Sequence, residues 1–205
     1  MWAKIESGSV SKIFTKPTQL KIGDINYPRN IFELWSESDL KTLGIYPVVQ
    51  DNSNLKDSEY YINGNSSYSF ADDTVTLSYA SATAKPMTDT LFTAEDEAAN
   101  SYHVEGTVKS RGLKSEKKTQ INGTANSLLQ ETDWMVIREA DGGTAMPSNI
   151  KTWRASVRTK ANAMCTQIDN AADVDALAAL YAYTNTGTEE NPVYTRPLGE
   201  FPELS

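Results

Sequence analysis

Apolar residues that recur at three- and four-residue steps constrain the fold of this chain more than any other feature. The series lies between residues 150 and 168, and its members share one face of a helix: Ile150, Trp153, Val157, Ala161, Met164, Cys165 and Ile168. Pro147 and Ser148 precede the series, and we expect Ser148 to be the N-cap of this helix. The spacing therefore predicts one long amphipathic helix.

A second helix is predicted directly after the first. Asp173 is a good N-cap, and Val174, Leu177, Ala178 and Tyr181 share a face behind it. Only a few residues join the two helices, so we expect an antiparallel αα-hairpin. Ahead of them, Trp134 to Ile137 has the apolar density of a strand, and Gly142-Gly143 ends it. From Thr184 the chain is rich in Thr, Asn, Gly and Pro, and its last part, TRPLGEFPELS, is expected to be extended and able to lie along a partner.

The first ninety residues favour β-structure. Tight turns are predicted at Ser7-Gly8-Ser9 and at Gly23-Asp24. Ser36 is the expected N-cap of a short helix, and Gly44 stands where a C′ glycine belongs. Apolar runs that predict strands follow at 45–49, 60–62, 68–70 and 74–79, with turn formers between the last three.

Residues 91–131 change in character, since Ala, Glu and Lys replace Tyr and Thr. This composition predicts helix, with Thr93 capping a short one and a longer one from about Lys109 to Leu129. The longer helix is poor in apolar residues, so we expect it to depend on neighbouring elements or a partner chain. The sequence thus predicts an α+β protein: a β-rich domain at 1–90, a helical linker region at 91–131 and a C-terminal helical hairpin with an extended tail at 132–205.

The overall charge limits the classes of partner. The formal net charge is −8, which disfavours sequence-independent nucleic-acid binding, because that needs a basic face. It also disfavours an anionic membrane surface, and the sequence contains no apolar run of transmembrane length. Cys165 is the only cysteine, so no intrachain disulfide can form and we expect folding in a reducing cytoplasm.

Side chains for catalysis or metal binding are scarce. His103 is the only histidine, and Cys165 lies on the apolar helix face, where a small buried hydrophobe is expected. Asp72-Asp73 is interpreted as a turn rather than a cation site. The common nucleotide-binding, hydrolase and metalloprotease motifs are absent from the sequence. We therefore expect a protein that is not an enzyme, with no catalytic residues, no cofactor and no metal.

Two groups of basic residues are candidates for contact with a partner. The first is the cluster Lys109, Arg111, Lys114, Lys117 and Lys118. It forms either an anion-binding patch or the solvated face of an exposed helix, and the absence of interleaved aromatics favours the second interpretation. The second group is Arg154 and Arg158, which fall largely outside the apolar face and are expected to be solvated, paired or partner-facing.

The aromatic residues of the β-rich region have two interpretations. Tyr60, Tyr61 and Tyr68 are candidates for a glycan-binding platform, in which rings stack on sugar faces. Aromatic residues also favour strands and pack in their cores, and this second interpretation is the more general one.

Three segments resemble proteins of tailed bacteriophages. NIFELWSESDLKTLGIYPVV, residues 30–49, is similar to a short module of tail and fibre-associated proteins, with Trp35 ahead of a capped helix and a glycine turn. TDWMVIREADGGTAMPSNIKTWRASVRTKANAM, residues 132–164, resembles the C-terminal region of that group, which has an aspartate-tryptophan strand and a proline-led helix with an arginine pair such as Arg154 and Arg158. The opening MWAKIESGSV is similar to the start of such proteins.

The resemblance implies a non-enzymatic virion protein of the phage tail, made in the host cytoplasm: a tail-fibre, fibre-adaptor or baseplate-peripheral subunit. Its partners would be other tail or virion proteins, and fibres of this group are commonly threefold, so a homotrimer is expected. Two alternatives stay open. One is a tail-fibre assembly chaperone, and the other is a receptor-binding module that contacts a host surface glycan through the tyrosines.

Overall fold

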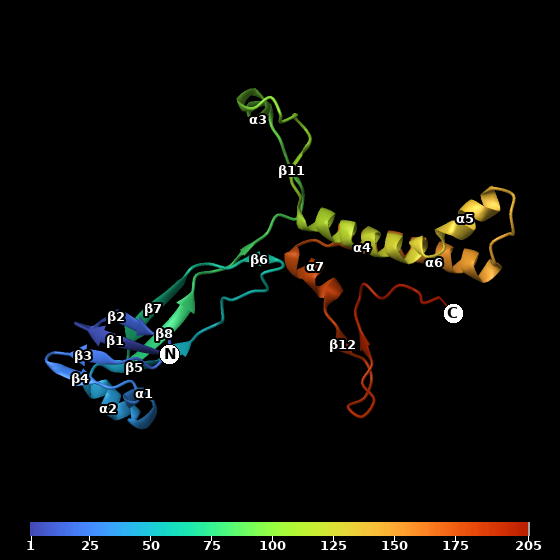
Figure 1. Ribbon diagram of the computed structural model, residues 1–205. Helices are drawn as coiled ribbons and strands as arrows, with labels where there is room; N and C mark the ends of the chain where they lie inside the picture. Colours follow the sequence, from blue (N-terminus) through green and yellow to red (C-terminus); the bar gives the residue numbers. More distant parts are fainter. Residues whose placement is uncertain (205) are drawn as a thin grey trace. The chain divides into compact units, whose positions relative to one another are not determined.

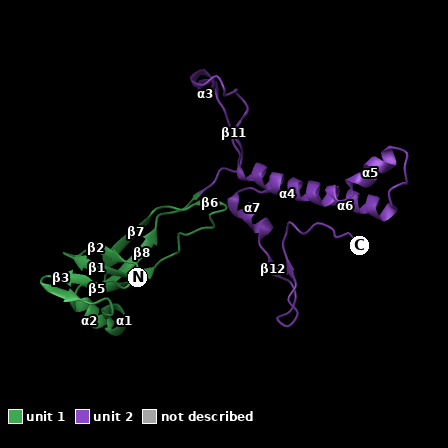
Figure 2. Ribbon diagram, in the orientation of Figure 1, with its two compact units in different colours: residues 1–83 green, residues 84–205 purple. Residues whose placement is uncertain are grey.

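The computed structural model describes residues 1–204 of the chain and divides into two compact units, residues 1–83 and 84–205 (Figure 1). The expected α+β class is confirmed, with the main sheet in unit 1 and the long helices in unit 2 (Figure 2). The sequence placed a boundary near residue 90 and set 91–131 apart as a linker. In the structure the boundary follows Thr83, and the middle region belongs to the same unit as the C-terminal helices.

Unit 1 is built on a five-stranded sheet with the order β2-β1-β5-β8-β7. Its strands are β1 (Trp2–Glu6), β2 (Ser9–Phe14), β5 (Ile45–Gln50), β7 (Ser66–Ala71) and β8 (Thr74–Tyr79). The β5–β8 pair is parallel, and the other pairs of this sheet are antiparallel. Both predicted tight turns in this sheet are confirmed, at Ser7-Gly8 and Asp72-Asp73, where all four residues have positive φ as two-residue hairpin loops require.

A short hairpin and two short helices contribute to the core of unit 1. The elements are β3 (Leu20–Ile22), β4 (Ile25–Tyr27), α1 (Ile31–Leu34) and α2 (Glu37–Thr42). The predicted cap of α2 is confirmed: Ser36 and Asp39 form a capping box, and Gly44 has φ +72° just past the helix. The buried side chains of this core are Phe14, Ile31, Phe32, Leu40 and Ile45. Two short strands, β6 (Tyr61–Ile62) and β9 (Thr83–Ala84), pair near the end of the unit.

Two antiparallel helices form the centre of unit 2. They are α4 (Leu113–Gln130) and α6 (Ser148–Asn170), which lie side by side in Figure 1. The faces that meet are small and apolar, with Ile121 and Ala125 on α4 and Val157, Ala161 and Met164 on α6, all buried. The apolar face predicted for residues 150–168 is therefore confirmed at these positions. The helix predicted at 109–129, which is poor in apolar residues, starts four residues later than expected. It is covered by α6.

The segment Trp134 to Ile137 is a helix, so the predicted strand is wrong. It belongs to α5 (Asp133–Ala140), which ends before Gly142-Gly143. A run of four apolar residues has no periodicity that separates strand from helix, and here the following Arg-Glu-Ala continues the helix. The prediction of Ser148 as N-cap is also wrong, because Pro147 holds the N-cap position of α6 and no side chain caps it.

Helix α7 (Val174–Tyr181) follows α6 after a short turn and is capped by Asp173, as predicted. The close antiparallel partner of α6 is α4 rather than α7, so the expected hairpin is formed by different helices. We call residues 89–112 the arm. It contains β10 (Thr90–Leu91), α3 (Ala94–Ala99), capped by Thr93 as predicted, and β11 (Val108–Ser110). A second hairpin, β12 (Thr184–Asn185) with β13 (Tyr194–Thr195), follows α7.

Candidate functional site

The predicted basic cluster is tied to other parts of unit 2. Lys109 forms an ion pair with Asp96 at 2.6 Å, and Lys118 forms one with Asp169 at 2.7 Å. The hydrogen bond from Lys118 to Asp169 raises the pKa of Lys118.

The other three cations of the cluster are also engaged. Arg111 donates to the Thr119 hydroxyl, Lys114 donates to the backbone carbonyl of Asp169, and buried Lys117 places its ammonium 4.6 Å from the Tyr181 ring centroid. These contacts favour a structural role for the cluster over an open anion-binding patch.

The base of the arm supplies the acceptors that the start of α4 needs. The amides of Leu113 and Lys114 donate to the carbonyls of Pro86 and Met87, at 2.9 and 3.1 Å. The Gly112 amide donates to the Asp89 carboxylate at 2.8 Å, and this bond lowers the pKa of Asp89. The first amides of a helix have no partner within it, so residues 86–89 act as the cap of α4.

Glycine is required at position 112, because there is no space for a side chain where the two segments at the base of the arm cross. A Cβ at this position would lie 2.3 Å from the backbone carbon and oxygen of Thr88. Glycine thus lets the two chain segments at the base of the arm pass in contact.

Arg154 is buried and paired with Asp133, so the expected pairing is confirmed, whereas a solvated or partner-facing position is wrong. Its side chain reaches the C-terminal end of α4, where Nη1 donates to the Leu129 carbonyl at 2.7 Å and to the Thr132 hydroxyl at 2.6 Å. Nη2 donates to the Asp133 carboxylate at 2.7 Å. A guanidinium suits this position because its planar fork carries several donors, and the last carbonyls of a helix need them. Arg154 therefore joins α4, α5 and α6.

Arg158 has a different environment, although it lies one turn further along α6. Its side chain is exposed, and it makes no hydrogen bond or ion pair within residues 1–204. It lines a cavity between α5 and α6. The structure thus separates the predicted arginine pair into one structural residue and one residue available for contact.

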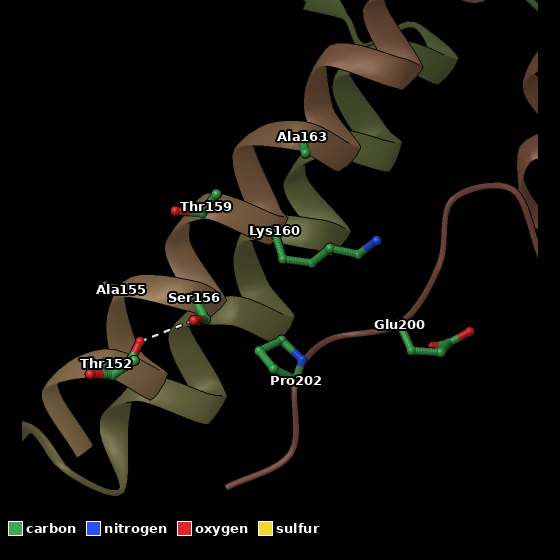
Figure 3. Close-up of a pocket in the computed structure, with 8 residues that line it drawn as sticks. All are labelled: Thr152, Ala155, Ser156, Thr159, Lys160, Ala163, Glu200 and Pro202. Carbon is green, nitrogen blue, oxygen red and sulfur yellow. Dashed lines mark hydrogen bonds between the residues drawn. The ribbon is translucent and has the colours of Figure 1, made fainter. Parts of the chain in front are cut away.

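The C-terminal tail, residues 196–204, lies on α6 of its own chain, whereas the sequence led us to expect it along a partner. The Trp153 indole donates to the Pro202 carbonyl at 2.9 Å, Leu198 is fully buried, and the Leu198 amide donates to the Leu180 carbonyl. The tail forms a groove with α6, shown in Figure 3. The volume of this groove is about 510 Å³. Its lining is Thr152, Ala155, Ser156, Thr159, Lys160, Ala163, Glu200 and Pro202.

Two polar side chains of this groove, Ser156 and Glu200, make local contacts within unit 2. The Ser156 hydroxyl donates to the Thr152 carbonyl at 3.1 Å, a bond drawn in Figure 3. Glu200 accepts from the Tyr183 hydroxyl at 2.6 Å and forms an ion pair with Arg196. The hydroxyl and the carboxylate are thus engaged locally, and the remaining lining is mostly small side chains along one face of α6.

The candidate glycan tyrosines do not form one open platform. Tyr60 is only 4% exposed, so a sugar has no access to its ring face, and this candidate is corrected to a core residue. Tyr61 is half-buried, with the Lys56 ammonium 6.0 Å from its ring centroid. Tyr68 is partly exposed on β7, and its hydroxyl contacts the Met1 sulfur at 3.6 Å.

The two reactive side chains lie in different elements. Cys165 on α6 is partly exposed, so the expected core position is wrong, and its partial burial raises the pKa of the thiol. His103 lies in the arm, stacked on Phe92 with ring centroids 4.2 Å apart. Within residues 1–204, no group of three or more His, Cys, Asp or Glu side chains is arranged to hold a metal ion, and no helix has both the length and the apolarity to span a membrane.

Large exposed apolar side chains gather on three segments of unit 2, and sequence patterns did not single them out. Tyr102 in the arm is 92% exposed, Ile137 on α5 is 69% exposed, and Tyr194 in the second hairpin is 63% exposed. Trp134, Val104 and Val193 add to the same three segments, each more than half exposed.

Comparisons of the chain with family models, with curated proteins and with solved structures found no match.

Proposed function

We propose that this protein is a non-enzymatic structural subunit of a bacteriophage virion, in a tail fibre, a fibre adaptor or the periphery of a baseplate. The main support for this proposal is the set of exposed apolar side chains on the arm, α5 and the second hairpin, represented by Tyr102, Ile137 and Tyr194. Each of these segments carries two or more such side chains close together in the chain, and we take these groups as candidate protein–protein contact sites. The resemblance of the N-terminal and C-terminal segments to tail proteins supplies the narrower assignment.

The exposed area of the protein supports a role in assembly. Two separate compact units of these sizes would together expose about 11,400 Å². The protein exposes 13313 Å². The excess of about 1,900 Å² is larger than the roughly 800 Å² that one partner buries in an interface of standard size. The protein therefore carries enough surplus surface for at least one stable interface with a neighbour.

A tail-fibre assembly chaperone would use the same exposed surfaces, but transiently. The glycan-binding alternative is weaker, because Tyr60 is buried and the three candidate tyrosines lack a shared open face. We therefore favour the virion subunit over the chaperone and the glycan-binding module. Its partners would be tail proteins, and the expected oligomer is a homotrimer.

Mass spectrometry of purified virions distinguishes a structural subunit from an assembly chaperone. A structural subunit is present at a fixed ratio to the known tail proteins. A chaperone is absent from particles and co-purifies with a fibre protein from infected cells. Absence from both preparations contradicts the proposal.

Variants test whether the exposed side chains of unit 2 carry assembly. Tyr102→Ser and Ile137→Ser are expected to lower incorporation into particles. Leu34→Ser is the matched control, because Leu34 is 75% exposed but belongs to unit 1. Sedimentation of the purified 22.6 kDa chain gives the oligomeric state of each variant. Equal incorporation of all three variants would remove the argument from exposed apolar groups.

A further inference from the structure

The cavity between α5 and α6 combines an apolar wall with cationic side chains. Its volume is about 370 Å³, at the small end of the range for ligand pockets. Val136 and Met146 form the apolar part, from α5 and the connection that follows it. The remaining lining residues are Glu139, Lys151, Arg154 and Arg158.

The charges around this cavity leave one cation without a partner. Lys151 pairs with Glu139 at 2.6 Å, and Arg154 pairs with Asp133 at 2.7 Å. Glu139 is held in place, since its second oxygen accepts from the Met146 amide, and its bond to Lys151 lowers its pKa. Arg158 has no counter-ion among residues 1–204. The cavity therefore carries one uncompensated positive charge.

The two guanidinium groups offer several free donors to this cavity. Arg154 uses both hydrogens of Nη1 and one of Nη2, which leaves the Nε hydrogen and one Nη2 hydrogen. Arg158 keeps all five. Guanidinium groups bind carboxylates through two parallel hydrogen bonds, and such bonds are stronger than those between neutral groups.

We propose that this cavity binds a peptide segment of a partner protein in which a carboxylate side chain lies next to a large apolar side chain. The carboxylate pairs with Arg158 and compensates its charge. The apolar side chain covers Val136 and Met146. This inference does not depend on the virion role.

Other classes of ligand fit less well. A polyanion such as nucleic acid needs a field of positive charge, whereas this site has one surplus charge on a chain of net charge −8. Inorganic phosphate would pair with Arg158 but would gain nothing from the apolar wall. A purely apolar segment would leave the Arg158 charge beside it without a partner, which is unfavourable.

A titration of the full-length protein followed by NMR tests the proposal. The probe is the blocked peptide acetyl-Gly-Leu-Glu-Gly-amide, and the comparison peptide has Gln in place of Glu. The Glu peptide is expected to shift the Arg158 Nε–H resonance and the backbone amides of Val136 and Lys151. Because the charge-assisted bonds are lost with Gln, the second peptide is expected to bind about tenfold more weakly.

Two variants make the result specific. Arg158→Met should abolish the shifts at an unchanged melting temperature, because its side chain makes no bond within the described chain. Arg29→Met is the matched control, an exposed arginine of unit 1 that should leave the titration unchanged. Equal binding of both peptides, absence of shifts, or full retention of binding in Arg158→Met overturns the proposal. Equal binding of phosphate and the Glu peptide also overturns it, since the site would then recognise an anion alone.

Discussion

Replacement of Arg154 by Met probes the contact that joins the three helices α4, α5 and α6. The methionine side chain keeps most of the aliphatic length that packs beside α4 but removes all hydrogen-bond donors. The Leu129 carbonyl and the Thr132 hydroxyl then lose a charged donor at 2.7 and 2.6 Å. The Asp133 carboxylate loses its partner but returns to water, since its side chain is 53% exposed.

The expected cost follows from these three bonds. The two hydrogen bonds from the charged donor, one buried and one partly buried, contribute about 1.5 kcal/mol each. The half-exposed ion pair with Asp133 adds at most about 1 kcal/mol. Removal of a buried guanidinium relieves its desolvation, which offsets about 1–2 kcal/mol. The net loss is about 2 kcal/mol, and for a unit of this size it lowers the melting temperature by roughly 6–12 °C.

Thermal unfolding followed by circular dichroism at 222 nm measures this loss, because the long helices are all in unit 2. Arg158→Met is the control, with the same chemical change one turn further along α6. It should melt within about 2 °C of the unchanged protein, as substitutions of exposed residues usually do. If Arg154→Met and Arg158→Met melt at the same temperature, then Arg154 does not stabilise the helix junction and the reasoning is refuted.

Three further predictions concern other parts of unit 2. Gly112→Ala should destabilise by about 1–3 kcal/mol, because its Cβ meets the Thr88 backbone. Gly123→Ala, in open space on α4, should stabilise by about 0.5–1 kcal/mol; urea unfolding compares the two, and equal effects would contradict the steric argument. Asp96 accepts from Lys109, which lowers its pKa below 3.8, so its contribution to the arm is present above that pH and lost below it. The NMR signals of the arm should change as the pH falls through the lowered pKa, and a persisting transition in Asp96→Asn would assign it to another group. Burial raises the pKa of Cys165, so alkylation by iodoacetamide should reach half its maximal rate at a higher pH in the folded than in the unfolded protein. Coincident pH profiles would argue against this.

Local chemistry made part of the fold predictable. Ser36, Thr93 and Asp173 were identified as helix caps because a cap depends on one side chain and the amides of the next turn. The turns at Ser7-Gly8 and Asp72-Asp73 were identified for the same reason. The apolar face of α6 could be recognised because one period repeats over about five turns, from Ile150 to Ile168.

Features that depend on tertiary contacts were not predictable. Nothing in the local sequence shows that the end of α4 needs a donor, so Arg154 was placed outside the core. Helix α5 was taken for a strand because its apolar run is too short to show a period. Tyr60 and Tyr61 are adjacent in the chain, yet one is buried and the other half-buried, and only the fold distinguishes them.

The two ends of the arm are held next to each other, because the Gly112 amide is bonded to the Asp89 carboxylate and Thr90 pairs with Ser110. The start of α4 takes its acceptors from Pro86, Met87 and Asp89, all of which precede β10. A shorter, longer or unrelated loop can therefore replace residues 91–109 at a small cost in chain entropy, since the two ends are already held together. The arm can in this sense be exchanged as a unit. Such a protein can thereby acquire a new binding partner while its helices stay the same.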